Sequence, residues 1–593
     1  MTRPTLPQQD PQPDQRLREL ARAREVYRYD HDAYPPLALA AEVPKSEEPT
    51  REWNALAAER TVRLAINSAR LDATGEHVNP RDHDPLRDLI LAGALGGMKG
   101  ILEKVDELVK TGHTTGRADE LSDFADLFRE IELPAIAGDF REDATFAEQR
   151  LSGANPMWIR RLSEPLDHFP VTEAHYGAAT AGGPAAGDTL AAALAEGRLY
   201  LADYSCLEGA ACGTFPAGQK YLAAPLALFA SPPASAPRRG LLPIAIQCAP
   251  SPGPGAPIVT PRDGQAWLIA KTRVQTADGN CHQAISHLGH THMPLEAFTL
   301  ATHRQLSARH PLFVLLAPHC EGTLSINESA NVTLLAPQGG VDMVLAGTIE
   351  TSRAVAAQAA ASWDFDARVF PTELAARGVD DAAALPGYAY RDDGLLIWGA
   401  LREWVETYLH TYYPSDAEVQ ADRELQAWCA EVSAQDGGRI KGFATGGRIA
   451  SRDYLVTAVT HMIFTASAVH AAVNFPQFTA MAYVPNWPLA SYTPPGGAAS
   501  EQAWFDLLPP LEAAHMQLSL GYLLGTLHYT ELGHYKREHV LFDHFRDARV
   551  RPAAKAFKAR LDAVEETITQ RNGRRAAPYI HLLPSRIPQS INI

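Results

Sequence analysis

Cysteine is scarce in this chain, with six residues among 593. None of them forms a CxxC motif, and their spacing is not that of a disulfide framework. The positions are Cys206, Cys212, Cys248, Cys281, Cys320 and Cys429. We expect free thiols in a reducing cytoplasm, since a chain of this length does not depend on disulfides for its core. Without a Cys ligand set or an HExxH motif, structural zinc and zinc-protease sites are not indicated.

Positively charged residues are also fewer than negatively charged ones. The chain has 53 Lys and Arg and 69 Asp and Glu, which gives a net charge of −16. No basic stripe is present, which argues against a nucleic-acid partner. No window reaches the roughly 18 apolar residues of a membrane-spanning helix. Residues 1–14 are rich in Pro, Gln and Asp and contain no apolar core of a secretory signal. We therefore expect a cytoplasmic protein without a transmembrane segment.

Long linkers are missing as well, because no Gly/Ser-rich or Pro-rich stretch interrupts residues 51–593. Residues 1–50 mix prolines with charges and are interpreted as an N-terminal lead-in that is partly irregular. Hydrophobic residues make up 46% of the chain, enough for a sizeable core. We predict one large domain over residues 51–593.

Apolar periodicity predicts a mainly α fold with a minor β portion before residue 260. Short strands are predicted at 199–204 and 241–248, with a loop at 177–187. The predicted helical segments begin near residue 52 and continue at 86–108, 119–131, 267–318, 353–364, 395–413, 451–475 and 511–532.

Three histidines lie close together in the segment Ser286-His287-Leu288-Gly289-His290-Thr291-His292. On an ideal helix, metal-binding histidines are spaced i, i+4, and no pair here has that spacing. The i, i+5 pair, His287 and His292, diverges by roughly 140° on an α-helix. One π-helical turn would bring both onto one face, and such turns are frequent at functional sites. Spacing alone leaves all three pairs open, and ordinary surface histidines remain an alternative.

Two further features could complete a metal site. His470 and Asn474 are spaced i, i+4 with only small or apolar residues between them, although a lone histidine there could equally be a core residue. The chain ends in an apolar tail after Pro588, and burial of Ile593 would carry its α-carboxylate into a dry interior. A buried carboxylate must be paired or bound to a metal. Imidazoles with an amide oxygen and one carboxylate suit redox-active iron better than structural zinc.

These residues also carry a family resemblance. The segment from His287 through His310-Pro311 resembles the iron-binding helix of lipoxygenases, His470-Ala471-Ala472-Val473-Asn474-Phe475 resembles their second iron helix, and Ser590-Ile591-Asn592-Ile593 resembles their C-terminal tail. The similarity continues in segments 146–156, 267–271 and 391–395, and so covers roughly residues 50–593. Pro476 departs from the glycine that is common in the family. The family's N-terminal β-barrel has no counterpart here, as in short bacterial lipoxygenases.

The resemblance implies one non-heme iron bound by His287, His292, His470, Asn474 and the Ile593 carboxylate. It selects the i, i+5 pair and so implies a π-helical turn near residues 287–292. The remaining histidines, His290, His303, His310 and His319, are then structural or surface residues. For Glu296, a salt bridge or a surface role is expected. Manganese in place of iron is a less favoured variant.

The resemblance further implies a large helical catalytic domain acting on a polyunsaturated fatty acid and O₂. A ferric iron carrying hydroxide takes a hydrogen atom from a bis-allylic carbon, and O₂ traps the radical as a conjugated hydroperoxide. The absence of a Ser/His/Asp signature agrees with chemistry that needs no side-chain nucleophile. Two alternatives share the family's features: an enzyme that rearranges hydroperoxides, and an inactive lipid-binding protein.

Further residues are expected around the implied iron. Gln283, one turn before His287, and Gln477, three residues after Asn474, are expected to bond toward the site or to bridge the two helices, and simple hydrogen bonding within the core is an equal alternative. Ala330 matches a position where alanine accompanies S-configured products in the family. Gly279 and Val344 match positions that set pocket depth, and their small size suggests a deep pocket. The remaining candidates for the substrate channel are apolar residues that could equally belong to the ordinary core: Leu288, Ile326, Leu345 and Leu524.

Overall fold

The computed structural model describes residues 3–72, 100, 116–237, 239–253, 255–535 and 544–593. The helix expected at 86–108 therefore lies outside the described residues, apart from Gly100. The described part is mainly helical, and its strands all end by Val259, as the sequence predicted. The main helices are α1 (Pro13–Val26), α2 (Arg51–Asp72), α5 (Asp143–Ser152), α6 (Glu173–Thr180), α8 (Gln265–Cys281), α9 (Met293–Gln305), α10 (Pro311–Cys320), α11 (Thr323–Val332), α13 (Ile349–Ser362), α15 (Ala389–His410), α17 (Arg423–Ser433), α18 (Arg452–Phe464), α21 (Leu511–Thr526) and α22 (Arg551–Asn572).

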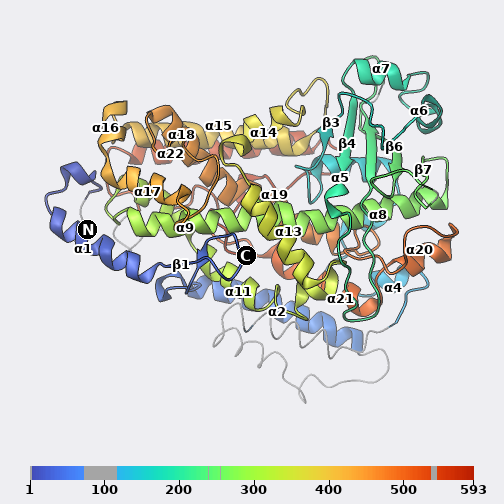
Figure 1. The fold of residues 1–593 in the computed structure, drawn as a ribbon, viewed down its shortest axis with the longest axis horizontal. Helices are drawn as coiled ribbons and strands as arrows, with labels where there is room; N and C mark the ends of the chain where they lie inside the picture. Colours follow the sequence, from blue (N-terminus) through green and yellow to red (C-terminus); the bar gives the residue numbers. More distant parts are fainter. Residues whose placement is uncertain (1–2, 73–99, 101–115, 238, 254, 536–543) are drawn as a thin grey trace.

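The β portion is an antiparallel sheet at one end of the molecule, close to α5, α6 and α7 (Leu190–Ala195) (Figure 1). Its strands follow the chain order β3 (Arg160–Arg161), β4 (Leu199–Asp203), β5 (Leu226–Ala230), β6 (Leu242–Gln247) and β7 (Ile258–Val259). β4 and β6 confirm the two predicted strands, whereas β5 was not predicted. A separate two-stranded sheet pairs β1 (Tyr29–Asp30) with β2 (Leu39–Ala40).

Two predicted segments differ markedly from the structure. The helix expected at 119–131 is reduced to α4 (Leu121–Ala125). Beyond it, the amides of residues 129–131 donate to Oδ1 of Asn67 instead of to helical carbonyls. The loop expected at 177–187 begins only after Thr180, because the capping box of Thr172 and His175 starts α6 upstream of Gly177. In both cases a polar side chain overrides the local pattern.

Two long helical runs form the centre of the fold. The first joins α8, the π-helix η5 (His282–His292) and α9 without a break. The second joins α18, the π-helix η7 (Thr465–Val469), α19 (His470–Asn474) and, after Pro476, the π-helix η8 (Gln477–Met481). Among the described residues, the run Arg452–Met481 is the one helical stretch long and apolar enough to cross a membrane, with a mean hydropathy of 1.4. Since 89% of that window is buried inside the protein, core packing accounts for its apolar character.

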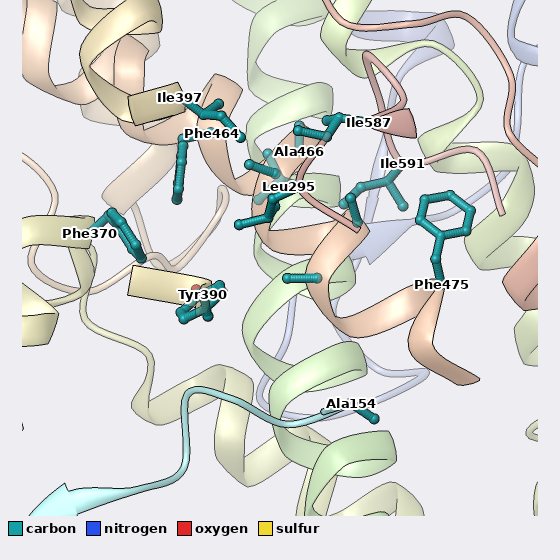
Figure 2. Packing of buried hydrophobic residues seen from close by; sticks show 14 of the residues in the cluster. Ala154, Leu295, Phe370, Tyr390, Ile397, Phe464, Ala466, Phe475, Ile587 and Ile591 are labelled. Atoms are coloured by element: carbon teal, nitrogen blue, oxygen red, sulfur yellow. The ribbon is translucent and has the colours of Figure 1, made fainter. Parts of the chain in front are cut away.

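The C-terminal tail ends in the middle of the molecule (Figure 1). Ile587 and Ile591 are fully buried, and Figure 2 shows them among core side chains that include Phe475. The tail backbone is also held, because the Trp53 indole donates to the Asn592 carbonyl over 2.9 Å. The predicted burial of the apolar tail is confirmed.

Residues before 51 pack onto this centre. Leu6 belongs to the same hydrophobic cluster as Trp53, and α1 buries Arg16 in an ion pair with Glu424. The amide of Ala40, in β2, donates to the carboxylate of Glu296 in α9 over 2.7 Å. The first fifty residues thus contact the helix that continues the π-helix η5.

Candidate metal centre

Three histidines from the two central runs face a common point. His287 and His292 come from η5, and their Nε2 atoms are 3.1 Å apart. His470 comes from α19, and one ligand nitrogen from each ring lies within 4.8 Å of the other two. All three side chains are buried. The expected i, i+5 geometry and its π-helical turn are therefore confirmed, with the π-helix extending over eleven residues.

The π-helix is stabilised by its own side chains and by close packing. The hydroxyl of Thr291 donates to the Ser286 carbonyl, five residues earlier, over 2.8 Å. Gly289 allows α13 to approach, because a Cβ there would lie 2.7 Å from the Cβ of Ala359 and 3.0 Å from the Ala356 carbonyl oxygen. Such an approach explains glycine at the centre of a buried helix, where its conformational freedom is otherwise a cost.

Burial keeps the three imidazoles neutral. It lowers the pKa of His292 to about 4, and it lowers the pKa values of His287 and His470 well below their ordinary range. Neighbouring histidines add to the shift at His287 and His470. Neutral imidazole is the form that binds metal ions, so the cluster is ready for a metal at neutral pH.

The C-terminus adds negative charge to this cluster. Ile593 is 2% exposed, and its terminal oxygen lies 3.1 Å from Nε2 of His470. A buried carboxylate needs a compensating positive charge, and the described residues show no ion pair to Ile593. The Nε2 atoms of His287 and His292, 3.1 Å apart, converge on one point beside it. A divalent or trivalent cation satisfies both conditions. The donor set of nitrogens and carboxylate oxygen fits non-heme iron.

Asn474 lies one turn after His470 and is held by a hydrogen-bonded chain. Its Nδ2 donates to the Leu524 carbonyl over 2.7 Å, and its Oδ1 accepts from Nε2 of Gln477 over 2.9 Å. Nε2 of Gln283 then donates to Oε1 of Gln477 over 2.8 Å. The expected bridge between the two helices by Gln283 and Gln477 is confirmed. α19 ends at Asn474 with Phe475 as its C-cap, and Pro476 directly precedes η8, which begins at Gln477.

A second hydrogen-bonded chain was missed from sequence. Nδ1 of His292 donates to Oδ1 of Asn327 over 2.8 Å, and Nδ2 of Asn327 donates to Glu296 over 2.6 Å. Glu296 is 3% exposed, so the expected salt bridge or surface role was wrong. Burial raises its pKa to about 7. Glu296 stands one turn after His292 and was visible as a candidate, but Asn327 lies in α11 and no local pattern connects it to the site.

We expect Asn327→Ala to weaken metal binding about 10- to 100-fold, because the acceptor that fixes the His292 ring is lost. Competition with a chelator, followed by metal analysis, measures the change. Ser329→Ala, on the same helix, serves as the matched control and should leave affinity unchanged. Equal affinities of the Asn327 variant and the parent protein would contradict this role.

An apolar cavity of about 110 Å³ adjoins the cluster. His287, His292 and Ile593 contribute to its wall, together with Gln283 and Gln477. Six of the predicted channel residues line it: Leu288, Ile326, Ala330, Val344, Leu345 and Leu524.

Gly279 is the exception among the predicted channel residues. It is absent from the lining, and a Cβ at this position would lie 2.5 Å from Cδ2 of Leu489. Leu489 lines the cavity instead. Leu489 therefore fills the space beside Gly279. The expectation that Gly279 deepens the substrate pocket was wrong.

The other histidines have separate roles. His290 does not line the apolar cavity beside the cluster and instead contributes to a second cavity of mixed polar and apolar lining. His310 is bonded to Asp422 over 2.9 Å, and His319 to the Gln589 carbonyl over 2.7 Å. His303 stacks on Tyr27 with ring centroids 4.3 Å apart. His303, His310 and His319 thus have structural contacts, within the structural or surface roles that were expected, and His290 takes no part in the cluster.

Comparisons with known proteins agree with this geometry. The lipoxygenase family model matches residues 122–578. The chain is 42% identical over 510 residues to a linoleate 9/13-lipoxygenase of Pseudomonas aeruginosa, covering 83% of this chain and 72% of that protein. It is 37% identical over 462 residues to the hydroperoxide isomerase ALOXE3 of Homo sapiens, covering 76% and 62%. An anaerobic crystal structure of a LOX variant with arachidonate superimposes with a TM-score of 0.85 at 28% identity, covering 100% of this chain and 84% of that one.

Proposed function

Because this chain belongs to the lipoxygenase family of dioxygenases, we propose that it inserts O₂ into polyunsaturated fatty acids to give S-configured conjugated hydroperoxides. The proposal includes one non-heme iron held by His287, His292, His470, Asn474 and the Ile593 carboxylate. The observation that carries it is the buried cluster of three neutral imidazoles and a terminal carboxylate beside an apolar cavity. Similarity to a linoleate lipoxygenase supports the substrate class.

Iron held by these residues would supply the one-electron oxidation needed to remove a hydrogen atom from a bis-allylic carbon. The protein contributes position and environment. Leu288 and Ile326 give the pentadiene an apolar surface near His287 and His292. Gln283 and Gln477 keep their amides bonded to each other at the cavity wall, so they present few free polar groups to the hydrocarbon.

The direct test adds linoleate to the purified, metal-loaded protein and follows conjugated diene by ultraviolet absorbance, with oxygen uptake and elemental analysis in parallel. The proposal expects diene formation, consumption of O₂ and about one iron per chain. Manganese in place of iron would correct the metal assignment alone. Absence of both diene and metal would overturn the proposed function and favour an inactive lipid-binding protein.

A second candidate is rearrangement of fatty-acid hydroperoxides, which the similarity to ALOXE3 favours. This activity would use the same cavity and the same cluster. Supplying linoleate and linoleate hydroperoxide separately distinguishes the two, because only the oxygenase consumes O₂ with linoleate. We also propose a cytoplasmic location, which the six free cysteines support.

Product configuration is attributed to Ala330, which is half-buried in α11 and lines the cavity. We expect Ala330→Gly to change the main product from the S to the R enantiomer, since loss of the methyl group opens space for O₂ on another part of the pentadiene. Chiral chromatography of the hydroperoxides measures the ratio. Ser329→Gly introduces glycine next to this position, outside the cavity lining, and should leave S in excess. An unchanged ratio in the Ala330 variant would remove this residue from the proposal.

A further inference from the structure

Cys206 and Cys281 face each other across the junction between the β portion and the metal-binding run. Their Sγ atoms are 3.7 Å apart, within hydrogen-bond distance for sulfur. Cys206 lies in the short 3₁₀ helix η4 (Ser205–Leu207) just after β4. Cys281 is the last residue of α8, directly before η5. Nothing in the proposed oxygenation uses either thiol.

The two thiols differ in accessibility. Cys281 is fully buried, whereas Cys206 is exposed and lines the second cavity, of about 570 Å³. This cavity also contacts Ser286 and His290, on the face of η5 opposite the metal cluster. A small oxidant can therefore reach Cys206 from solvent, whereas Cys281 is accessible only to Cys206.

The thiols also differ in acidity. The hydrogen bond from Cys281 lowers the pKa of Cys206, whereas burial raises the pKa of Cys281 well above its ordinary value. Burial likewise raises the pKa values of Cys212, Cys248, Cys320 and Cys429. Cys206 is thus the cysteine of this chain most disposed to react as a thiolate.

We propose that Cys206 and Cys281 form a peroxide-oxidised dithiol, a modification site for organic hydroperoxides placed directly before the metal-binding π-helix. The Cys206 thiolate attacks the hydroperoxide, the O–O bond breaks, and the alkoxide leaves and is protonated to the alcohol. Cys206 becomes a sulfenic acid. The Cys281 thiol then displaces hydroxide from that sulfur, and its proton leaves with the hydroxide as water. Two thiols are oxidised and one hydroperoxide is reduced.

Oxidation also has a structural consequence. A disulfide needs the sulfurs at about 2.05 Å, so they must approach by roughly 1.7 Å. Cys281 has little room to move, because neighbouring Asp278 is held by Asn155 over 2.6 Å, and Asn155 also accepts from Ser286 over 2.8 Å. We therefore expect the backbone of η4, or the start of η5, to move when the disulfide forms. The oxidised protein is expected to turn over fatty acid at least three-fold more slowly, with recovery under dithiothreitol.

The test treats the holoprotein with linoleate hydroperoxide, blocks remaining thiols and maps the cysteines under non-reducing conditions. The expected result is a Cys206–Cys281 disulfide, reversed by dithiothreitol, forming at least ten-fold faster than any oxidation of Cys212. Cys206→Ser should remove both the disulfide and the thiol-dependent share of alcohol, and Cys212→Ser should retain both. Any reaction of the metal with the hydroperoxide is common to the parent protein and both variants. The difference in alcohol formed between the Cys206 and Cys212 variants therefore measures the contribution of the thiols.

Mapping of the parent protein needs no variant, so a folding defect in Cys206→Ser does not remove the test. A Cys206 that stays reduced, or that is oxidised without pairing to Cys281, overturns the proposal. Because the hydroperoxide is added directly, this result is independent of whether the chain oxygenates linoleate.

Discussion

Extension of the chain beyond Ile593, for example by a C-terminal affinity tag, is expected to abolish metal binding and oxygenase activity. The terminal oxygen lies 3.1 Å from Nε2 of His470 in a site where Ile593 is 2% exposed. A peptide bond at this position removes the negative charge and forces further residues into a closed interior. Elemental analysis and diene formation from linoleate measure the effect, which should exceed about 100-fold in rate because the proposed anionic ligand is lost.

The matched control for this experiment is Ile593→Val, which keeps the carboxylate and removes one methylene. Its expected cost is about 1 kcal/mol, too little to release a tail that also buries Ile587 and Ile591. Metal content should then match the parent protein. Deletion of Ile593 should behave like the tag, since the carboxylate moves to Asn592, whose carbonyl is engaged by Trp53. Full activity of a tagged protein would refute the role of the terminus.

Replacement of a clustered histidine is expected to be equally severe. His287→Ala or His470→Ala removes one of three imidazoles that converge within 4.8 Å, so metal content should fall below one tenth of the parent value. Activity should fall at least about 100-fold, because the oxidant of the reaction is lost with the metal. Metal analysis and oxygen uptake report the two effects separately.

His290→Ala is the control for the histidine variants, because it comes from the same π-helix and the same local sequence. His290 lines the second cavity and takes no part in the cluster. Its variant should retain metal and most activity. Loss of metal from the His290 variant, with retention in the His287 variant, would reverse the assignment of faces on η5.

Much of the fold follows from local periodicity. The sequence located the two central runs, the strands β4 and β6, and the position of the β portion before residue 260. It was less accurate where a side chain from elsewhere competes for backbone groups. Asn67 binds the amides after α4 and ends a helix whose own pattern continues. Such long-range competition has no signature in a window of ten residues.

For the site, the sequence by itself determined which groups are present. These are the histidines of the segment 287–292, His470 with an amide one turn later, and an apolar C-terminus whose burial carries its carboxylate inward. Spacing alone could not choose among the pairs of His287, His290 and His292. The direction in which each side chain points depends on the number of residues per turn, which differs between an α-helix and a π-helix. The tertiary structure decided that question through the π-helix, whose packing on α13 requires Gly289.

Only the tertiary structure brought in partners from distant segments. Asn327 reaches His292 from α11, Leu489 fills the space beside Gly279, and Cys206 meets Cys281 from the end of β4. Each contact joins residues that share no periodicity, because they meet by packing of separate elements. The sequence specified the chemistry of the groups, and packing specified which of them face one another.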